Sequence, residues 1–190
     1  MRIISGKFRS RKLIKFNKEG IKPTTDKMRE SIFNIVISYL KINEKNNNLF
    51  FEEFNVLDIF AGTGALGLEA MSRGAENVTF IEKSRDNLRV LYKNIDHLKV
   101  SKKVKIIKRS INKVKRIEGS FDLIFMDPPY QMDIIFKKTL KKILDFKAIK
   151  KNSLVILEHA RKKKIVIPKE FEIIKEKNYG NSSVTLIKLK

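Results

Sequence analysis

The chain has 190 residues, of which 42% are hydrophobic and 33% are charged, and this predicts one folded domain with a sizeable core rather than a disordered segment. It has no cysteine and only two histidines, His97 and His159, which excludes disulfides and thiolate metal sites and leaves no metal cluster to expect. No apolar run reaches the roughly 18 residues of a membrane span and the start lacks a signal-peptide core, so we expect a cytoplasmic monomer with no membrane partner.

The net charge is the strongest feature of the composition. Lysine and arginine together number 42 against 21 acidic residues, which gives a formal charge of +21. Such an excess predicts a polyanionic partner, attracted without regard to its sequence. A proteome rich in lysine, isoleucine and asparagine would also raise the lysine content, and composition alone leaves both explanations open.

Residues 1–22 are basic and carry apolar residues at intervals, with a turn signal at Ser5-Gly6. We expect a curled pair of short strands here. Basic side chains interleaved with aromatic ones suit phosphate contacts and base stacking. A solvated edge strand, protected from aggregation by its charge, would have the same composition.

The next segment, residues 24–40, has apolar residues at three- and four-residue spacings, which predicts a helix capped by Thr25 or Asp26. Residues 41–53 are polar, contain three consecutive asparagines, and are expected to form a loop that leads to the main sheet.

A strand, a glycine turn and a helix are predicted over residues 56–67. Gly62, Gly64 and Gly67 match G-x-G-x-x-G, a pattern that also admits a nicotinamide cofactor. The next strand, residues 78–82, ends at Glu82, where a carboxylate can accept both hydroxyls of a ribose. The segment therefore predicts a Rossmann-like fold whose ligand carries an adenosine-type sugar.

Asp58 distinguishes between the possible ligands. It lies four residues before Gly62, inside the end of a buried strand, where a carboxylate is costly unless it is hydrogen-bonded or meets a cation. It would repel a pyrophosphate but complement the ammonium or sulfonium of S-adenosylmethionine. A carboxylate that merely caps the glycine turn is the simpler alternative, and the two roles can coexist.

The remaining chain alternates between helices and strands. We expect a helix over 84–98, strands over 104–108, 121–126 and 153–158, a helix marked by Met132, Phe136 and Leu140, and a closing hairpin of 171–177 with 184–189. Ser110 and Ile111 follow the third strand, where an adenine ring should lie. The predicted fold is a Rossmann-like class I S-adenosylmethionine-dependent methyltransferase, α/β, with a seven-stranded, mostly parallel sheet and a C-terminal antiparallel hairpin.

Asp127-Pro128-Pro129-Tyr130 follows the predicted strand 121–126. Proline has no N–H and a fixed φ, so the strand must stop and the next residues form a stiff rim at the end where α/β sheets bind ligands. Asp127 and the Pro128 carbonyl can accept hydrogen bonds from a ring amine while Tyr130 stacks on the ring. An ordinary strand-end turn would need none of these functions.

The sequence resembles the family of bacterial 16S ribosomal RNA guanine-N2 methyltransferases called RsmD, over nearly its whole length. The resemblance rests on residues 2–8, 22–34, 57–70, 127–130 and 179–180. Three positions depart from the family pattern: Lys22 replaces arginine, Ser10 replaces a usual glycine, and Ser110 replaces an acid or amide. The resemblance implies that the substrate is a guanine of 16S rRNA in a small ribosomal subunit or its assembly intermediate.

These observations together assign the expected site residues. Residues 1–24 would be a basic β extension that contacts RNA, and residues 25–190 the catalytic domain. The expected catalytic residues are Asp127, Pro128, Pro129 and Tyr130. The expected cofactor-binding residues are Asp58, Phe60, Ala61, Gly62, Thr63, Gly64, Glu82, Lys83, Ser110, Ile111 and Asp127. The expected RNA-binding residues are Arg2, Lys7, Arg9, Arg11, Lys12 and Arg29.

Three other functions use similar features. A DNA adenine-N6 methyltransferase shares the D-P-P-Y rim but normally carries a target-recognition domain, for which this chain has no room. A non-catalytic RNA-binding protein on the same fold would be expected to lose the glycines or the rim, and both are intact. A nicotinamide oxidoreductase is disfavoured by Asp58.

Overall fold

The computed structural model describes residues 1–15, 25–41, 50–128 and 134–190. Its helices are α1 (Asp26–Leu40), α2 (Ala65–Ser72), α3 (Arg85–Leu98) and α4 (Ile135–Asp145). Its strands are β1 (Asn55–Ile59), β2 (Asn77–Ile81), β3 (Val104–Ile107), β4 (Phe121–Met126), β5 (Ile149–Ala160), β6 (Phe171–Tyr179) and β7 (Ser182–Leu189). Two short 3-10 helices, η1 (Ser101–Lys103) and η2 (Ile111–Lys113), flank β3.

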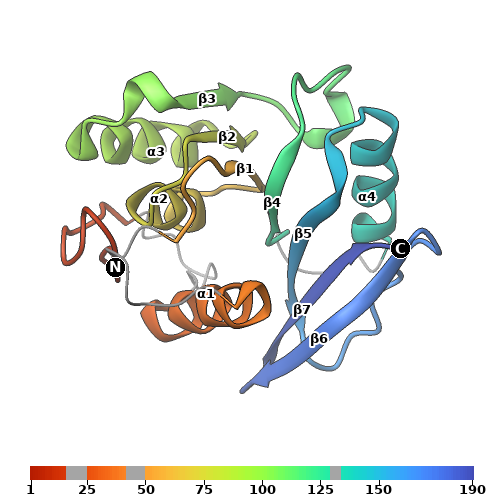
Figure 1. Ribbon diagram of the computed structural model, residues 1–190. Coiled ribbons are helices and arrows are strands. Elements are labelled where there is room, and N and C mark those ends of the chain that lie inside the picture. The colour runs from red at the N-terminus through yellow and green to blue at the C-terminus, as the bar shows by residue number, and fades with distance from the viewer. Residues whose placement is uncertain (16–24, 42–49, 129–133) are drawn as a thin grey trace.

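The seven strands form one sheet in the order β3-β2-β1-β4-β5-β7-β6 (Figure 1). Strands β1 to β5 pair in parallel, and β7 pairs antiparallel with both β5 and β6. Strand order reverses between β1 and β4, and in open α/β sheets ligands bind outside the carboxyl ends of the strands at this switch point. The predicted methyltransferase-like sheet with its closing hairpin is therefore confirmed.

Alternate residues of each strand face opposite sides, so the sheet has two apolar faces. Helices α1, α2 and α3 cover one face, where Val56, Phe80 and Phe125 are buried. Helix α4 and the segment after β3 cover the other, where Ile59, Met126 and Leu157 are buried. Burying both faces explains why the central strands are almost continuously apolar.

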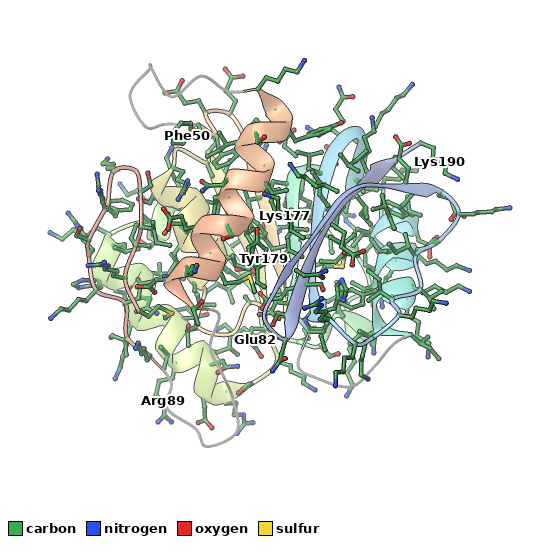
Figure 2. The ribbon with its side chains drawn as sticks, turned by 90° about the horizontal axis from the view of Figure 1, so that it is seen from below. Phe50, Glu82, Arg89, Lys177, Tyr179 and Lys190 are labelled. Atoms are coloured by element: carbon green, nitrogen blue, oxygen red, sulfur yellow. The ribbon has the colours of Figure 1, made fainter. Side chains whose placement is uncertain are left out.

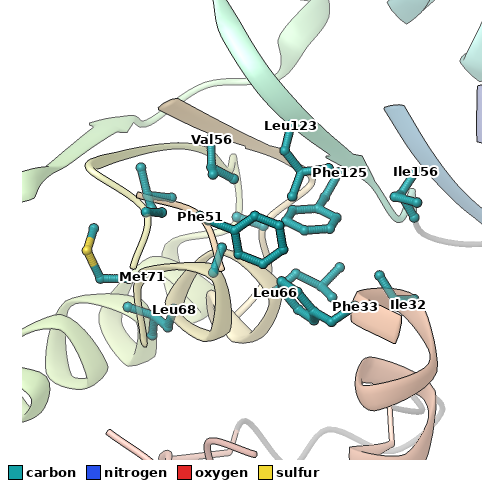
Figure 3. Close-up of a cluster of buried hydrophobic side chains, with 14 of the residues drawn as sticks. Ile32, Phe33, Phe51, Val56, Leu66, Leu68, Met71, Leu123, Phe125 and Ile156 are labelled. Atoms are coloured by element: carbon teal, nitrogen blue, oxygen red, sulfur yellow. The ribbon is translucent and has the colours of Figure 1, made fainter. Parts of the chain in front are cut away.

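Phenylalanines join α1 to the first face. Phe33 of α1 packs against Phe51 and against Phe125 of β4, with ring centroids 5.8 and 5.5 Å apart (Figure 3). Phe51 is completely buried. It belongs to the stretch 41–53 that the sequence predicted as a polar loop. That prediction followed the polar majority of the stretch and missed two core residues, Phe50 and Phe51.

The N-terminal segment, residues 1–15, is named the arm below. The sequence predicted two short strands here, but the arm holds a single antiparallel bridge between Arg2 and Lys12, and turns fill the space between them. Ile3, Phe8 and Leu13 are buried in the same cluster as α1 and α2. The arm is thus packed onto the domain through its own apolar residues.

Buried polar groups fix the arm to α2. The carboxylate of Glu69 accepts hydrogen bonds from the backbone N–H groups of Ile4 and Ser5 at 2.8 and 3.0 Å. The hydroxyl of Ser72 accepts from the N–H of Phe8 and donates to the carbonyl of Ser5.

No helix among the described residues is both long enough and apolar enough to cross a membrane.

Candidate active site

The glycine loop joins β1 to α2 at the carboxyl edge of the sheet. Gly64 and Gly67 are required by packing, because an added Cβ would lie 2.3 Å from Leu91 Cδ1 or from Phe80 Cε1, respectively. Gly62 differs, since a Cβ there would meet nothing within 4 Å, although its φ of +55° still favours glycine. Open space above Gly62 lets a ligand approach the backbone of the loop.

Asp58 lies at the end of β1 and is 2% exposed. Its Oδ2 accepts a hydrogen bond of 2.9 Å from the backbone N–H of Gly67 in the first turn of α2. The capping role that the sequence offered as an alternative is therefore present. Burial, followed by repulsion from Asp127 and Glu82, raises the pKa of the Asp58 carboxyl to about 7, and the Gly67 hydrogen bond opposes this shift.

Glu82 directly follows β2 and is 7% exposed. Its Oε2 accepts from the N–H of Gly62 at 2.7 Å, and its Oε1 accepts from the N–H groups of Lys83 and Ser84 at 2.8 and 2.7 Å. The carboxylate thus connects the glycine loop to the start of α3. A carboxylate has about four acceptor sites, so Glu82 keeps capacity for a sugar hydroxyl.

Three carboxylates therefore meet at the ends of three adjacent strands: Glu82 after β2, Asp58 in β1 and Asp127 after β4. Asp127 and Pro128 are half-buried. No cluster of His, Cys, Asp and Glu with metal-binding geometry occurs among the described residues. In a chain of charge +21, this concentration of negative charge fits a small cationic ligand such as S-adenosylmethionine.

The other predicted cofactor residues lie in the glycine loop and after strands β2 and β3. Phe60, Ala61 and Thr63 belong to the glycine loop, and the N–H groups of Phe60 and Ala61 both donate to the carbonyl of Ile81. Ser110 precedes η2 and is half-buried. Ile111 is buried in the α4-side core, and Lys83 is exposed. Pro129 and Tyr130, predicted as catalytic, lie outside the described residues.

The predicted RNA-binding residues divide into two groups. Arg2, Lys7, Arg9, Arg11 and Lys12 are all exposed on the arm. Arg29 is not exposed at all: one of its guanidinium nitrogens donates to the carbonyl of Arg2 and to Asp26 at 2.6 and 2.8 Å. The prediction for Arg29 was wrong, because this side chain joins the arm to the start of α1 and does not face solvent.

Asn94 of α3 is a residue that the sequence analysis missed. Its side chain is buried and hydrogen-bonds both to Ile14 of the arm and to Thr63 of the glycine loop. The sequence contains one indication of its role. Asn94 is a polar residue that falls among Leu91, Ile95 and Leu98, on the buried side of an amphipathic helix. A basic turn after β5 is a second feature that the sequence analysis missed.

Figure 2 views the molecule from below and labels Glu82 together with Lys177 and Tyr179 of β6. Two clefts among the described residues lie elsewhere, one beside β3 and one at the amino ends of the strands, and none of the predicted site residues lines either of them. We therefore locate the site from the strand ends and the acidic cluster.

Comparison with known proteins gives a consistent result. The family model described as conserved hypothetical protein 95 matches residues 1–188. Ribosomal RNA small subunit methyltransferase D of Haemophilus influenzae is 33% identical over 98% of this chain and 92% of its own length. The protein of that name from Buchnera aphidicola (subsp. Acyrthosiphon pisum) is 34% identical over 92% of this chain and 86% of its own.

Solved structures agree. The Escherichia coli protein yhhF, a candidate methyltransferase, has a TM-score of 0.80 and 27% identity, covering 100% of this chain and 98% of its own. The candidate methylase HI0767 of Haemophilus influenzae has a TM-score of 0.76 and 30% identity, covering 99% and 97%. The chain belongs to the ribosomal RNA small subunit methyltransferase D (RsmD) family, and its cofactor is S-adenosylmethionine.

Proposed function

We propose that this protein methylates the exocyclic N2 amine of a guanine in 16S rRNA during assembly of the small ribosomal subunit. The observation that carries the proposal is the acidic cluster of Asp58, Glu82 and Asp127 in a domain that also holds a basic arm fixed to α2. The names of the relatives, small subunit rRNA methyltransferases, support the substrate class. The proposal includes a monomer that acts in the cytoplasm, with residues 1–24 as an RNA-contacting extension of the catalytic domain.

The cofactor supplies a methyl group on a positively charged sulfur, and its transfer to nitrogen leaves a neutral thioether and one proton to be released. Glu82 is placed to accept a ribose hydroxyl, because the N–H groups of Gly62, Lys83 and Ser84 fix its carboxylate and leave about one acceptor site for the ligand. Asp58 complements the positive charge of the methionine part. The backbone above Gly62 leaves room for the ligand between them.

Asp127 and Pro128 act on the substrate amine. The lone pair of an exocyclic amine is delocalised into its ring, which makes the nitrogen a poor nucleophile. If the Asp127 carboxylate and the Pro128 carbonyl accept its two N–H bonds, the nitrogen moves toward a tetrahedral geometry and its lone pair becomes available. The reaction then needs alignment and exclusion of water more than acid–base strength. Tyr130, as a stacking platform for the unstacked base, remains a prediction from the sequence.

The arm supports recognition of RNA. Its exposed basic side chains stand on a backbone that Glu69 and Ser72 hold in place, so phosphate contacts would cost little ordering of the protein. Lys7 and Arg11 also lie over the ring of Phe8, at 5.8 and 5.1 Å from its centroid.

A methyl-transfer assay tests the proposal. Tritiated S-adenosylmethionine would be offered with naked 16S rRNA, small subunits, assembly intermediates and duplex DNA, and the labelled nucleoside would be identified by mass spectrometry. We expect N2-methylguanosine from 16S rRNA or from a particle that contains it. Label in adenine of duplex DNA would replace the proposal with DNA methylation. Binding of particles without transfer to any substrate would indicate a non-catalytic RNA-binding protein.

A further inference from the structure

A second basic surface lies at the end of β5. The strand ends at Ala160, and the next residues are Arg161-Lys162-Lys163-Lys164. The turn has a fixed backbone, because the N–H of Arg161 donates to the carbonyl of Asn181 at 2.8 Å and that of Lys163 donates to Ala160 at 3.0 Å. The run is therefore held against the tip of the β6–β7 hairpin rather than free in solution.

Three side chains of this turn are exposed, namely Arg161, Lys162 and Lys164, and together they are called the β5 turn surface below. Lys163 is half-buried and is not part of it. Within the described part of the chain, none of the three forms an ion pair, whereas Lys103, Lys105 and Lys150 at the opposite edge of the sheet each pair with an acid. No described acidic residue therefore neutralises the positive charge of the β5 turn surface through an ion pair.

Strand register gives the position of this surface relative to Asp127. Strands β4 and β5 are parallel neighbours in which Met126 pairs with Leu157, so Asp127 lies level with Glu158. Arg161 is three residues further along. At about 3.3 Å per residue and about 4.8 Å between strands, the turn begins roughly 10 Å beyond Asp127 and one strand to its side. The turn is thus within reach of the backbone of an RNA strand whose base lies at Asp127.

The arm and the β5 turn surface flank the site on opposite sides. The arm is fixed to α2 and, through Asn94, to α3, and α2 packs over β1 and β2. The turn follows β5 and contacts the hairpin, beyond β4 in the sheet order. In the sheet, β1 and β4 lie between β2, over which α2 packs, and β5, which precedes the turn. A polyanion held at both surfaces would therefore span the strands that end in Asp58 and Asp127.

We infer that the β5 turn surface binds the phosphate backbone of the rRNA on the side of the target nucleotide opposite to the arm. The inference rests on the proposed function, since it assumes that the substrate is RNA. It assigns a role to a run of charge outside the segments that carry the family resemblance. Single phosphate contacts of this kind position the substrate without reading its sequence.

The experiment compares two triple variants with the wild type. In the first, Arg161, Lys162 and Lys164 are replaced by glutamine. In the matched control, Lys102, Lys147 and Lys151 are replaced by glutamine; these are also exposed and unpaired among the described residues but lie near the amino ends of β3 and β5. Both variants lose the same charge, so any general electrostatic attraction falls equally. Binding to small subunits would be measured by filter titration at several salt concentrations.

We expect the first variant to show a slope of log K against log salt that is shallower by about 2, because each phosphate of single-stranded RNA that the protein no longer neutralises changes it by about 0.7. KM for the RNA should rise most at low salt, while kcat at saturating RNA and cofactor affinity stay unchanged. The control should keep the wild-type slope.

Equal slopes for the first variant and the wild type would overturn the inference, as would equal changes in both variants. Failure of the proposed function is distinguishable, because the wild type itself would then transfer no methyl group to 16S rRNA or its particles, whatever the salt slopes of the variants. Cofactor affinity, measured by calorimetry, reports whether each variant is folded.

Discussion

Asn94 donates a hydrogen bond of 3.0 Å from its Nδ2 to the carbonyl of Thr63, in the glycine loop. The same carboxamide exchanges hydrogen bonds with the backbone of Ile14, accepting at 2.7 Å and donating at 3.2 Å. Asn94 is completely buried. One side chain therefore connects the arm to the cofactor loop, two parts of the site that are distant in the sequence.

Replacing Asn94 by alanine should weaken cofactor binding and arm docking together. The change leaves partly buried backbone groups of Thr63 and Ile14 without this partner, at a cost of about 1–3 kcal/mol. We expect a cofactor affinity lower by about tenfold and faster cleavage of the arm by protease. Calorimetry and limited proteolysis would measure these. Asn112→Ala, at an exposed position, is the control; an Asn94→Ala protein with intact cofactor affinity would contradict the link.

Stability of the cofactor-free protein should depend on pH through Asp58. The pKa of this carboxyl is raised from 3.8 to about 7, so between these values the folded state holds a proton that the unfolded state has released. The free energy of unfolding should therefore be highest, as far as Asp58 is concerned, below its unfolded-state pKa of 3.8. It should fall as the pH rises from there to the folded-state pKa of about 7. Asp58→Asn keeps an acceptor for the Gly67 N–H but cannot ionise, so it should remove that slope.

Urea denaturation at several pH values would measure this pH dependence of stability. Glu52→Gln, at an exposed position, is the control. A cationic ligand favours the ionised carboxylate, so cofactor affinity of the wild type should rise with pH through about 7. In Asp58→Asn that rise should disappear. Parallel pH profiles of affinity in the two proteins would show that Asp58 does not titrate in the site.

Asp127 and Glu82 should fail in different ways. Asp127→Ala should abolish methyl transfer with cofactor affinity largely retained, because the proposed loss is about 2–4 kcal/mol of transition-state stabilisation at the amine. Glu82→Gln, which keeps the shape of the side chain, should raise the cofactor KM with little change at saturation. Steady-state kinetics and calorimetry separate the two. Loss of cofactor binding with turnover retained in Asp127→Ala would reverse the assignment.

Charge on the arm should act on RNA alone. A variant that neutralises the basic side chains of the arm tests this, with changes at Arg2, Lys7, Arg9, Arg11 and Lys12. The slope of log K for RNA binding against log salt should become shallower by roughly 0.7–0.9 for each phosphate that the arm no longer neutralises. These side chains are exposed, and the packing of Ile3, Phe8 and Leu13 is unchanged, so thermal stability and cofactor affinity should stay close to wild type. Parallel salt slopes would leave the arm charge without a role in recognition.

Gly6 and Gly119 offer a matched pair for testing how the arm docks. Both have a φ of +82°, so alanine is strained equally at each. A Cβ at Gly6 would lie 1.9 Å from the carbonyl oxygen of Ser72 in α2, whereas one at Gly119 meets nothing within 4 Å. Gly119→Ala should cost about 1 kcal/mol. Gly6→Ala should lower the free energy of unfolding clearly more and make the arm more sensitive to protease. Thermal unfolding measures both variants. Equal losses of stability would show that the close approach of Gly6 to α2 is unimportant.

Ser10 also lies in the arm and has an unusual backbone. Its φ is +67°, in the left-handed region, which explains why the resemblance places glycine there. The position was visible in the sequence, but its reason was visible only in the backbone.

The sequence by itself determined the sheet and the chemistry at its carboxyl edge. Glycines, acids and prolines at the ends of apolar strands are local features, and parallel strands bring their ends to one edge whatever the details of packing. That is why Asp58, Glu82 and the Asp127-Pro128 rim could be grouped before their positions were known. Whether a given polar side chain faces solvent or the interior depends on which segments pack against it. Tertiary structure alone therefore decided that Arg29 is buried, that Phe51 belongs to the core, that Asn94 joins the arm to the glycine loop, and that the turn after β5 follows the strand next to the one that ends at Asp127. Each of these relationships joins residues distant in the chain.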